Sequence, residues 1–133
     1  MKTRHVLTGA ILGLLLTAAT PLTTFAVEEG DFDLKTTRNL YNLCSVKADD
    51  PNYLHAHGTC KGFIKGVVQY HDGVSHKKQL KRLICYPETT TISDGIAAFV
   101  AWGGANLNDT KEMNGIPVVG LVRALSAKYP CTK

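Results

Sequence analysis

Histidine and cysteine are the residue types in this sequence whose side chains could do more than pack. His55 and His57 stand two positions apart, and Cys60 follows three residues later. All three side chains are ligands that zinc accepts. On a helix, however, residues two positions apart point in diverging directions, so these imidazoles cannot easily share one ion. The ligand spacing of structural zinc sites is also missing, and we predict no metal site.

His71 and Asp72 are a second candidate, because a histidine beside an aspartate can activate water. Secreted phospholipases use such a pair together with a glycine-rich calcium loop and a dense set of disulfides, and this sequence has neither. The simpler interpretation is a helix end, where a histidine cation meets the negative pole of the helix. Motifs for a nucleophilic serine or a bound phosphate are missing as well. We therefore expect no catalytic residue, no enzymatic activity and no cofactor.

The first 26 residues have the three parts of a cleavable signal peptide. A basic start is followed by an uncharged apolar run over residues 6–20. Thr24 and Ala26 then place small residues at the −3 and −1 positions of a cut after Ala26. The apolar run is shorter than the roughly 20 residues of a membrane-spanning helix. We expect this peptide to be removed, which leaves residues 27–133 as one periplasmic domain.

The charge of the chain gives no reason to expect nucleic acid as a partner. The full chain has a net charge of +4, and the signal peptide accounts for two of its basic residues. Short blocks of like charge, at residues 28–33 and 77–82, are typical of a solvated surface. We expect no nucleic acid partner, and no membrane contact after signal cleavage.

Apolar residues at helical spacing predict an all-α fold, a compact bundle of about four helices stapled by two disulfides. The first helix is expected over about residues 32–46, and the second from a start between 51 and 59 to about 70. The third helix is expected to begin at a capping box over residues 91–94 and to end at Gly103 and Gly104. The fourth helix is expected to begin at Pro117 and to stop at residues 129–131. A short basic helix over 76–83 is a further option.

Gly58, Gly62 and Gly66 recur every four residues along one side of the second helix. Glycine inside a helix costs roughly 0.5–1 kcal/mol relative to alanine. We therefore expect another backbone to pack closely along this side, with a locally weak helix as the alternative.

The four cysteines, Cys44, Cys60, Cys85 and Cys131, all follow the signal peptide. An even number in a small exported domain is typical of two disulfides and leaves no thiol free as a nucleophile. Consecutive antiparallel helices bring Cys44 near Cys60, while Cys85 precedes the third helix and Cys131 follows the fourth. We predict the bridges Cys44–Cys60 and Cys85–Cys131, and Cys60–Cys85 is the alternative if Cys60 lies far along its helix.

Four short motifs carry a family resemblance: LYNLC at 40–44, CKGFIKGV at 60–67, CYP at 85–87 and ALSAKYPC at 124–131. In this order they resemble the Rap/Tai family of immunity proteins over nearly the whole of residues 27–133. The resemblance implies an exported helical protein of Gram-negative bacteria. It also implies that the protein binds and blocks a peptidoglycan amidase delivered by type VI secretion.

The stretch Gly103–Gly115 departs from the family pattern, in which the third helix runs on toward a proline. It is polar, lacks hydrophobic anchoring and exceeds the roughly 2–8 residues of a usual helix link. The resemblance places recognition on a connecting loop, and a mobile solvent loop is the alternative. Trp102 at its base is expected in the core. The predicted partner-binding residues are Asn106, Asn108, Asp109, Lys111 and Glu112.

Two other function classes stay open. A periplasmic stress chaperone would need a dimer interface opened by acid, with His55, His57, His71 or His76 as triggers. It would also need surplus apolar surface, which the sequence does not show. A binding protein for a lipid or another small ligand would need a cavity between the helices. A homodimer is considered alongside the amidase as a partner.

Cleavage after Ala26 has a direct consequence for the purified protein. N-terminal sequencing of protein from the periplasm is expected to begin at Val27, because the small residues before it direct the cut. A chain that retains Met1 in the membrane fraction would contradict this prediction.

Overall fold

The computed structural model describes residues 26–76 and 80–131 of the chain. They form one short 3₁₀-helix and five α-helices, and no β-strand occurs among them, so the predicted all-α class is confirmed. Most of the predicted signal peptide, and residues 77–79 of the optional basic helix, lie outside the described residues. The elements are η1 (Glu29–Asp33), α1 (Thr37–Cys44), α2 (Tyr53–His76), α3 (Ile92–Ala105), α4 (Thr110–Met113) and α5 (Pro117–Lys128).

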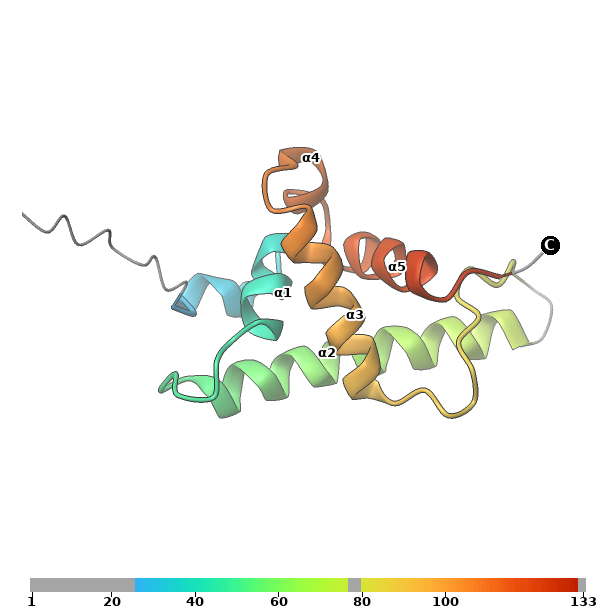
Figure 1. The fold of residues 1–133 in the computed structure, drawn as a ribbon, viewed down its shortest axis with the longest axis horizontal. Coiled ribbons are helices and arrows are strands. Elements are labelled where there is room, and N and C mark those ends of the chain that lie inside the picture. The colour runs from blue at the N-terminus through green and yellow to red at the C-terminus, as the bar shows by residue number, and fades with distance from the viewer. Residues whose placement is uncertain (1–25, 77–79, 132–133) are drawn as a thin grey trace, which may run out of the picture.

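The long helix α2 forms one side of the domain, and α3 crosses it at a steep angle (Figure 1). Helices α1 and α3 pack on α2, and α5 packs on α1 and α3. The short helix α4 lies at the C-terminal end of α3, on the far side from α2 (Figure 1). The connection between α3 and α5 therefore forms one end of the molecule.

The core lies where these helices cross. Phe99 of α3 is fully buried, as are Leu40 of α1, Ile64 of α2 and Leu121 of α5. Each of these residues has apolar neighbours at helical spacing along its own helix. This spacing is the pattern from which the helices were predicted. Burying such a side chain contributes about 1.5–3 kcal/mol before conformational entropy is counted.

The helix starts follow the expected local chemistry. Thr91 and Asp94 form the predicted capping box, in which Thr91 Oγ1 accepts from the Asp94 N–H at 3.2 Å. The backbone N–H and then the hydroxyl of Thr91 donate to the Asp94 carboxylate, and they hold its pKa below the ordinary value. Pro117 occupies the first turn of α5, also as predicted.

Several helix boundaries differ from those predicted. Helix α2 runs on to His76, well past Tyr70, while α1 is shorter than expected. Helix α3 passes through Gly103 and Gly104 and ends at Ala105. A Cβ at Gly103 would lie 2.3 Å from a ring carbon of Tyr41, so this glycine serves close packing inside the helix and does not end it. Residues 80–83 of the optional basic helix are not helical.

Close backbone packing occurs at glycines other than the predicted ones. Gly58, Gly62 and Gly66 are exposed, and a Cβ added at any of them would meet no atom within 4 Å. The expectation of close packing there is wrong, because this side of α2 faces solvent. A Cβ at Gly120 would instead lie 2.3 Å from the methyl carbon of Thr37. The close crossing is therefore between α5 and α1.

Both predicted disulfides are present. Cys44–Cys60 joins the end of α1 to α2, across 16 residues of sequence, and Cys85–Cys131 closes a longer loop of 46 residues. The backbone N–H of Cys85 also donates to the carbonyl of Tyr129 at 2.9 Å. The second bridge thus fixes the segment before α3 to the end of α5.

The N-terminal segment is fixed to α1 by a buried carboxylate. Asp31 accepts hydrogen bonds from the side-chain amides of Asn39 and Asn42, each at 3.0 Å. Leu34 ends η1 with a φ of 51°, a left-handed conformation that costs a non-glycine residue about 1–2 kcal/mol. Val27, the residue after the predicted cut, is buried in the core. The residue expected to start the mature chain is thus part of the packed core.

The glycine positions give a paired test of the fold. We expect Gly120→Ala to lower the free energy of unfolding by about 1–3 kcal/mol, because Thr37 is fully buried and cannot move away from the new methyl. The matched control Gly62→Ala is expected to raise it by roughly 0.5–1 kcal/mol, since its methyl meets only solvent. Urea unfolding measures both. Equal effects of the two variants would contradict this packing.

Candidate functional site

The predicted partner-binding loop is an ordered segment. After α3 the chain turns through residues 106–109 and forms α4, and we call residues 106–115 the α4 segment. Met113 is fully buried, so the expectation that this stretch lacks hydrophobic anchoring is wrong. Arg38 of α1 donates to the carbonyl of Leu107 at 2.7 Å, and the Thr37 N–H donates to the carbonyl of Gly115, also at 2.7 Å. Helix α1 therefore holds the segment at both ends.

Three of the five predicted site residues stabilise the segment itself. Asp109 caps α4 by accepting from the backbone N–H groups of Lys111 and Glu112. The side-chain amide of Asn106 donates to the carbonyl of Trp102 at 2.7 Å. Glu112 forms an ion pair with Arg123 of α5. These bonds fix the shape that the segment presents to solvent.

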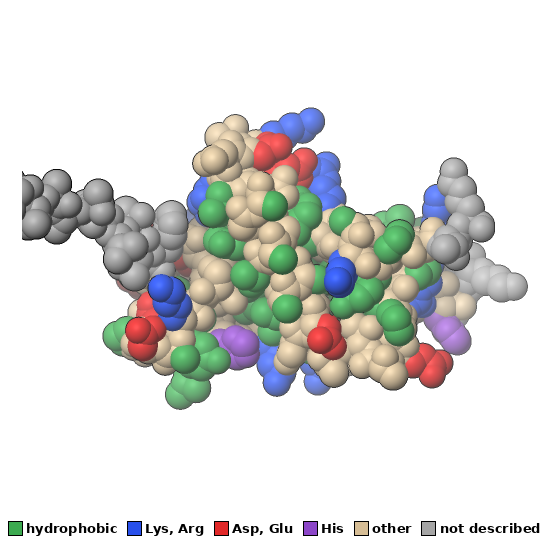
Figure 2. Space-filling model, in the orientation of Figure 1, with side chains coloured by type: hydrophobic (Ala, Val, Ile, Leu, Met, Phe, Trp, Pro, Cys, Tyr) green, Lys and Arg blue, Asp and Glu red, His purple; other side chains and the backbone are tan. Residues whose placement is uncertain are grey.

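Asn108 and Lys111 are the predicted site residues that project from this scaffold. Both are exposed, as are Asp109 and Thr110 between them. Figure 2 shows charged side chains of both signs at the α4 end of the molecule. The five predicted residues are thus all present at one end of the domain, and three of them, Asn108, Asp109 and Lys111, are exposed.

Trp102 at the base of the segment was expected in the core, and it packs against the core without being fully buried. It is half-buried, and its ring stacks on that of Phe99 with a centroid distance of 6.4 Å. Its carbonyl accepts from the Asn106 side chain, so it also supports the turn that follows α3. The backbone carbonyl of Trp102 therefore helps to hold the start of the α4 segment.

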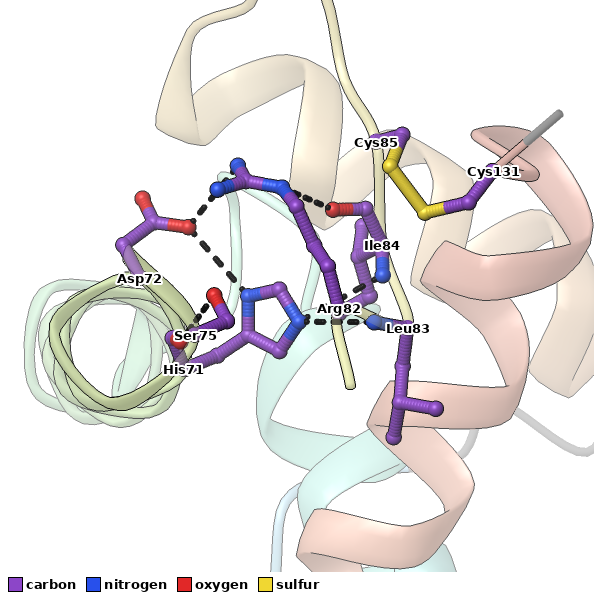
Figure 3. Close-up of a disulfide and its surroundings, with 8 residues drawn as sticks. All are labelled: His71, Asp72, Ser75, Arg82, Leu83, Ile84, Cys85 and Cys131. Atoms are coloured by element: carbon purple, nitrogen blue, oxygen red, sulfur yellow. Dashed lines mark hydrogen bonds and ion pairs between the residues drawn. A yellow bond between two sulfur atoms is a disulfide. The ribbon is translucent and has the colours of Figure 1, made fainter. Parts of the chain in front are cut away.

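His71 is buried, and both of its ring nitrogens have partners. Its Nε2 accepts from the backbone N–H of Leu83 at 3.1 Å and of Ile84 at 3.4 Å, and its Nδ1 lies 3.2 Å from Asp72 Oδ1 (Figure 3). A nitrogen that accepts two N–H groups cannot carry a proton, so the neutral ring donates from Nδ1 to Asp72. The predicted helix-end cation is therefore wrong, and Nε2 is not available as a base toward a substrate.

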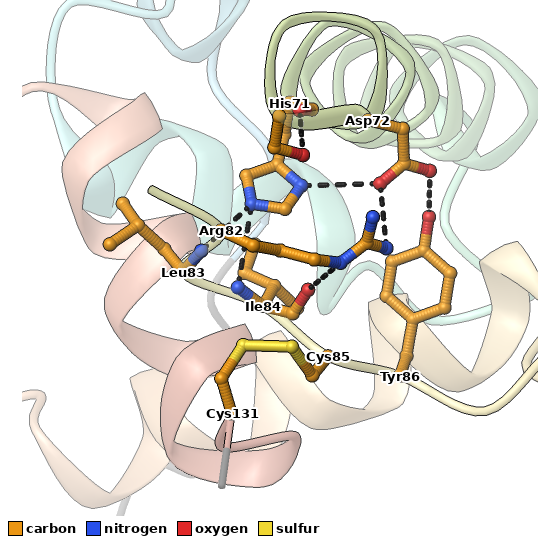
Figure 4. A network of polar contacts seen from close by, with 9 residues as sticks. His71, Asp72, Arg82, Leu83, Ile84, Cys85, Tyr86 and Cys131 are labelled. Atoms are coloured by element: carbon orange, nitrogen blue, oxygen red, sulfur yellow. Dashed lines mark hydrogen bonds and ion pairs between the residues drawn. A yellow bond between two sulfur atoms is a disulfide. The ribbon is translucent and has the colours of Figure 1, made fainter. Parts of the chain in front are cut away.

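Asp72 connects this histidine to two further side chains. It accepts from Arg82 Nη2 at 3.1 Å and from the Tyr86 hydroxyl, and Arg82 Nε donates to the carbonyl of Ile84 at 3.0 Å (Figure 4). Burial, together with the hydrogen bond to Asp72, raises the pKa of Tyr86 to about 12. The network fastens residues 82–86 to the C-terminal end of α2. The role of this network is structural. The sequence analysis singled out only two of its residues, His71 and Asp72.

His55 and His57 do not converge on a common point. The ring of His55 stacks on Phe32 with a centroid distance of 4.2 Å, and that of His57 stacks on Tyr53 at 5.3 Å. Among residues 26–76 and 80–131, no group of three His, Cys, Asp or Glu side chains could hold a metal ion. Within the same ranges no helix is long and apolar enough to cross a membrane.

Comparison with known families decides what this scaffold is. The family model of the Rap1a immunity proteins matches residues 36–131, which include all five α-helices and all four cysteines. The chain belongs to the Rap1a immunity protein family. Rap1a membership implies an immunity protein that binds a cognate effector, and the family is in general non-enzymatic. Searches of curated proteins and of solved structures gave no match.

The Tyr86–Asp72 contact predicts how the stability of this Rap1a domain depends on alkaline pH. The pKa of Tyr86 is higher in the folded chain than the ordinary value of 10, so the neutral phenol stabilises the fold fully below pH 10. That contribution is lost as the pH rises through about 12. We expect the free energy of unfolding to fall over this range, and to fall less steeply in Tyr86→Phe. Urea unfolding at successive pH values measures both, and parallel curves would contradict the assignment.

Proposed function

We propose that this Rap1a protein is a periplasmic immunity protein that binds and inhibits a peptidoglycan amidase delivered by type VI secretion. The family match carries the immunity role. Two disulfides fit an oxidising compartment, and residues 1–26 have the pattern of a signal peptide. The periplasm is also where such an amidase would meet peptidoglycan. The resemblance of the four cysteine-containing motifs supports the choice of an amidase.

We propose the α4 segment as the surface that contacts the effector. An inhibitor needs a rigid projection more than it needs a reactive group, because ordering a flexible loop on binding reduces affinity. The anchors from Arg38 and Met113 give the segment this rigidity before binding. Its exposed residues stand at one end of the molecule, where a concave active site could receive them. This arrangement is the observation that carries the proposed site.

The proposed contact is mainly polar. Asn108 offers both a donor and an acceptor, and Lys111 offers a positive charge at the tip of α4. Asp109 and Glu112 contribute carboxylates whose positions are fixed by the cap and by the ion pair with Arg123. Polar contacts of this kind favour selectivity for one partner over close relatives.

The inhibition itself is tested with purified components. Residues 27–133 are used to capture partners from the culture fluid of competing strains, and captured amidases are assayed on isolated peptidoglycan with increasing amounts of the protein. We expect stoichiometric loss of amidase activity. Capture of an effector with a different activity would refute the amidase assignment and leave the immunity role in place.

The proposed site is tested with variants that leave the anchors intact. We expect Asn108→Ala with Lys111→Glu to weaken inhibition by about tenfold or more, since truncating a central contact residue of an interface can cost about 2 kcal/mol or more and about 1.4 kcal/mol is tenfold. The thermal midpoint is expected to stay unchanged, because both side chains are exposed. Lys61→Glu on the solvent side of α2 is the charge-matched control. Full inhibition by the α4 variant would place the contact elsewhere on the protein.

A further inference from the structure

A half-open pocket of about 140 Å³ lies at the end of the domain opposite the α4 segment. It is formed by α2, α3 and α5 together with Tyr86, Thr90, Thr91 and Tyr129, around the N-terminal end of α3. Helix α3 has 14 residues and so spans about 20 Å between the pocket and the α4 segment. The pocket is therefore a separate feature from the proposed effector surface.

The floor of the pocket is apolar and its rim carries hydroxyl groups. Ile64 and Leu125 are almost fully buried at its base, and Gly95 between them has no side chain to fill the space. Tyr129 and Thr90 are half-exposed, so they lie nearer the opening. The described lining residues carry no formal charge. This composition suits a neutral apolar group with one polar substituent directed outward.

The walls of the pocket are fixed by bonds that do not depend on a ligand. Tyr86 is bound through its hydroxyl to Asp72, and its ring packs edge-on against that of Tyr129 with a centroid distance of 6.3 Å. The Cys85–Cys131 bridge lies directly beside this pair in sequence. A ligand would therefore enter a preformed site, without the cost of ordering its walls.

The volume limits the size of the occupant. An apolar protein cavity of about 150 Å³ stays dry and binds benzene. A pocket of about 140 Å³ thus accommodates one six-membered ring. We propose that this pocket binds a small neutral aromatic compound of the phenol class, with its ring against Ile64 and Leu125 and its hydroxyl toward Tyr129 and Thr90. The site is independent of the effector surface.

The test fills the pocket from its floor. A Cβ at Gly95 would lie 3.7 Å from the Ile64 methyl carbon and 3.9 Å from a Leu125 methyl carbon, so Gly95→Ala takes up space without a clash. The probe is 4-methylphenol, titrated into residues 27–133 while the methyl resonances of Ile64, Val68 and Leu125 are followed by NMR. We expect saturable shifts in the wild type and affinity reduced by about tenfold or more in Gly95→Ala.

Two comparisons make the outcome decisive. Gly62→Ala adds the same methyl to an exposed helix position and is expected to bind like the wild type. Benzoate, which has the same ring with a charge, is expected not to bind, because the described lining offers no cation. Val68→Phe fills the pocket from α2 and replaces Gly95→Ala if that variant does not fold. Unsaturable shifts in the wild type, or equal affinity in the filled variants, would overturn the proposal.

Discussion

A single buried threonine fixes the helices that carry the proposed effector surface. Thr37 is fully buried, and its N–H and hydroxyl both donate to the carbonyl of Gly115, at 2.7 and 3.0 Å. Its methyl group fills the space that a side chain at Gly120 would need. One residue at the start of α1 thus donates hydrogen bonds to the last carbonyl of the α4 segment. The same residue sets the distance between α1 and α5. A buried polar group that is fully bonded in this way specifies one arrangement of its neighbours.

The position of the α4 segment is consequently a property of α1, although the segment lies between α3 and α5 in sequence. Arg38, the next residue after Thr37, bonds to Leu107 at the other end of the segment. Both contacts join residues about 70 to 80 positions apart. The surface is therefore rigid only in the complete fold, and no peptide cut from the segment would reproduce it.

Features that depend on nearby residues could be predicted from the sequence. The capping box of Thr91 and Asp94, the proline at the start of α5 and the two cysteine pairs all follow from local hydrogen bonding and chain order. Helix α4 was missed because four residues are too few for a helical period to show. Its one local sign was Asp109 three positions before Glu112, a spacing typical of a helix start.

Contacts between distant side chains could not be predicted in this way. Which side of α2 faces solvent depends on how α1 and α3 pack on it. The close packing predicted along Gly58, Gly62 and Gly66 was therefore wrong. Arg82 and Tyr86 reach Asp72 only because the chain turns back along α2 after the helix ends. For the candidate site, the sequence located the segment and its polar residues, but not the buried Met113 that anchors it. The effector contacts of the five chosen residues stay a prediction.

The order of the cysteines has a consequence for how the protein reaches its native state. The cysteines are bonded as consecutive pairs, Cys44 to Cys60 and then Cys85 to Cys131. A chain that enters an oxidising compartment N-terminus first would therefore present each cysteine with its correct partner before the following pair arrives. An oxidase that joins thiols in their order of arrival would make the two native bridges one after the other, with no wrong pairing between them. Biogenesis of this domain thus calls for oxidation of thiols, but not for reshuffling of misplaced disulfides.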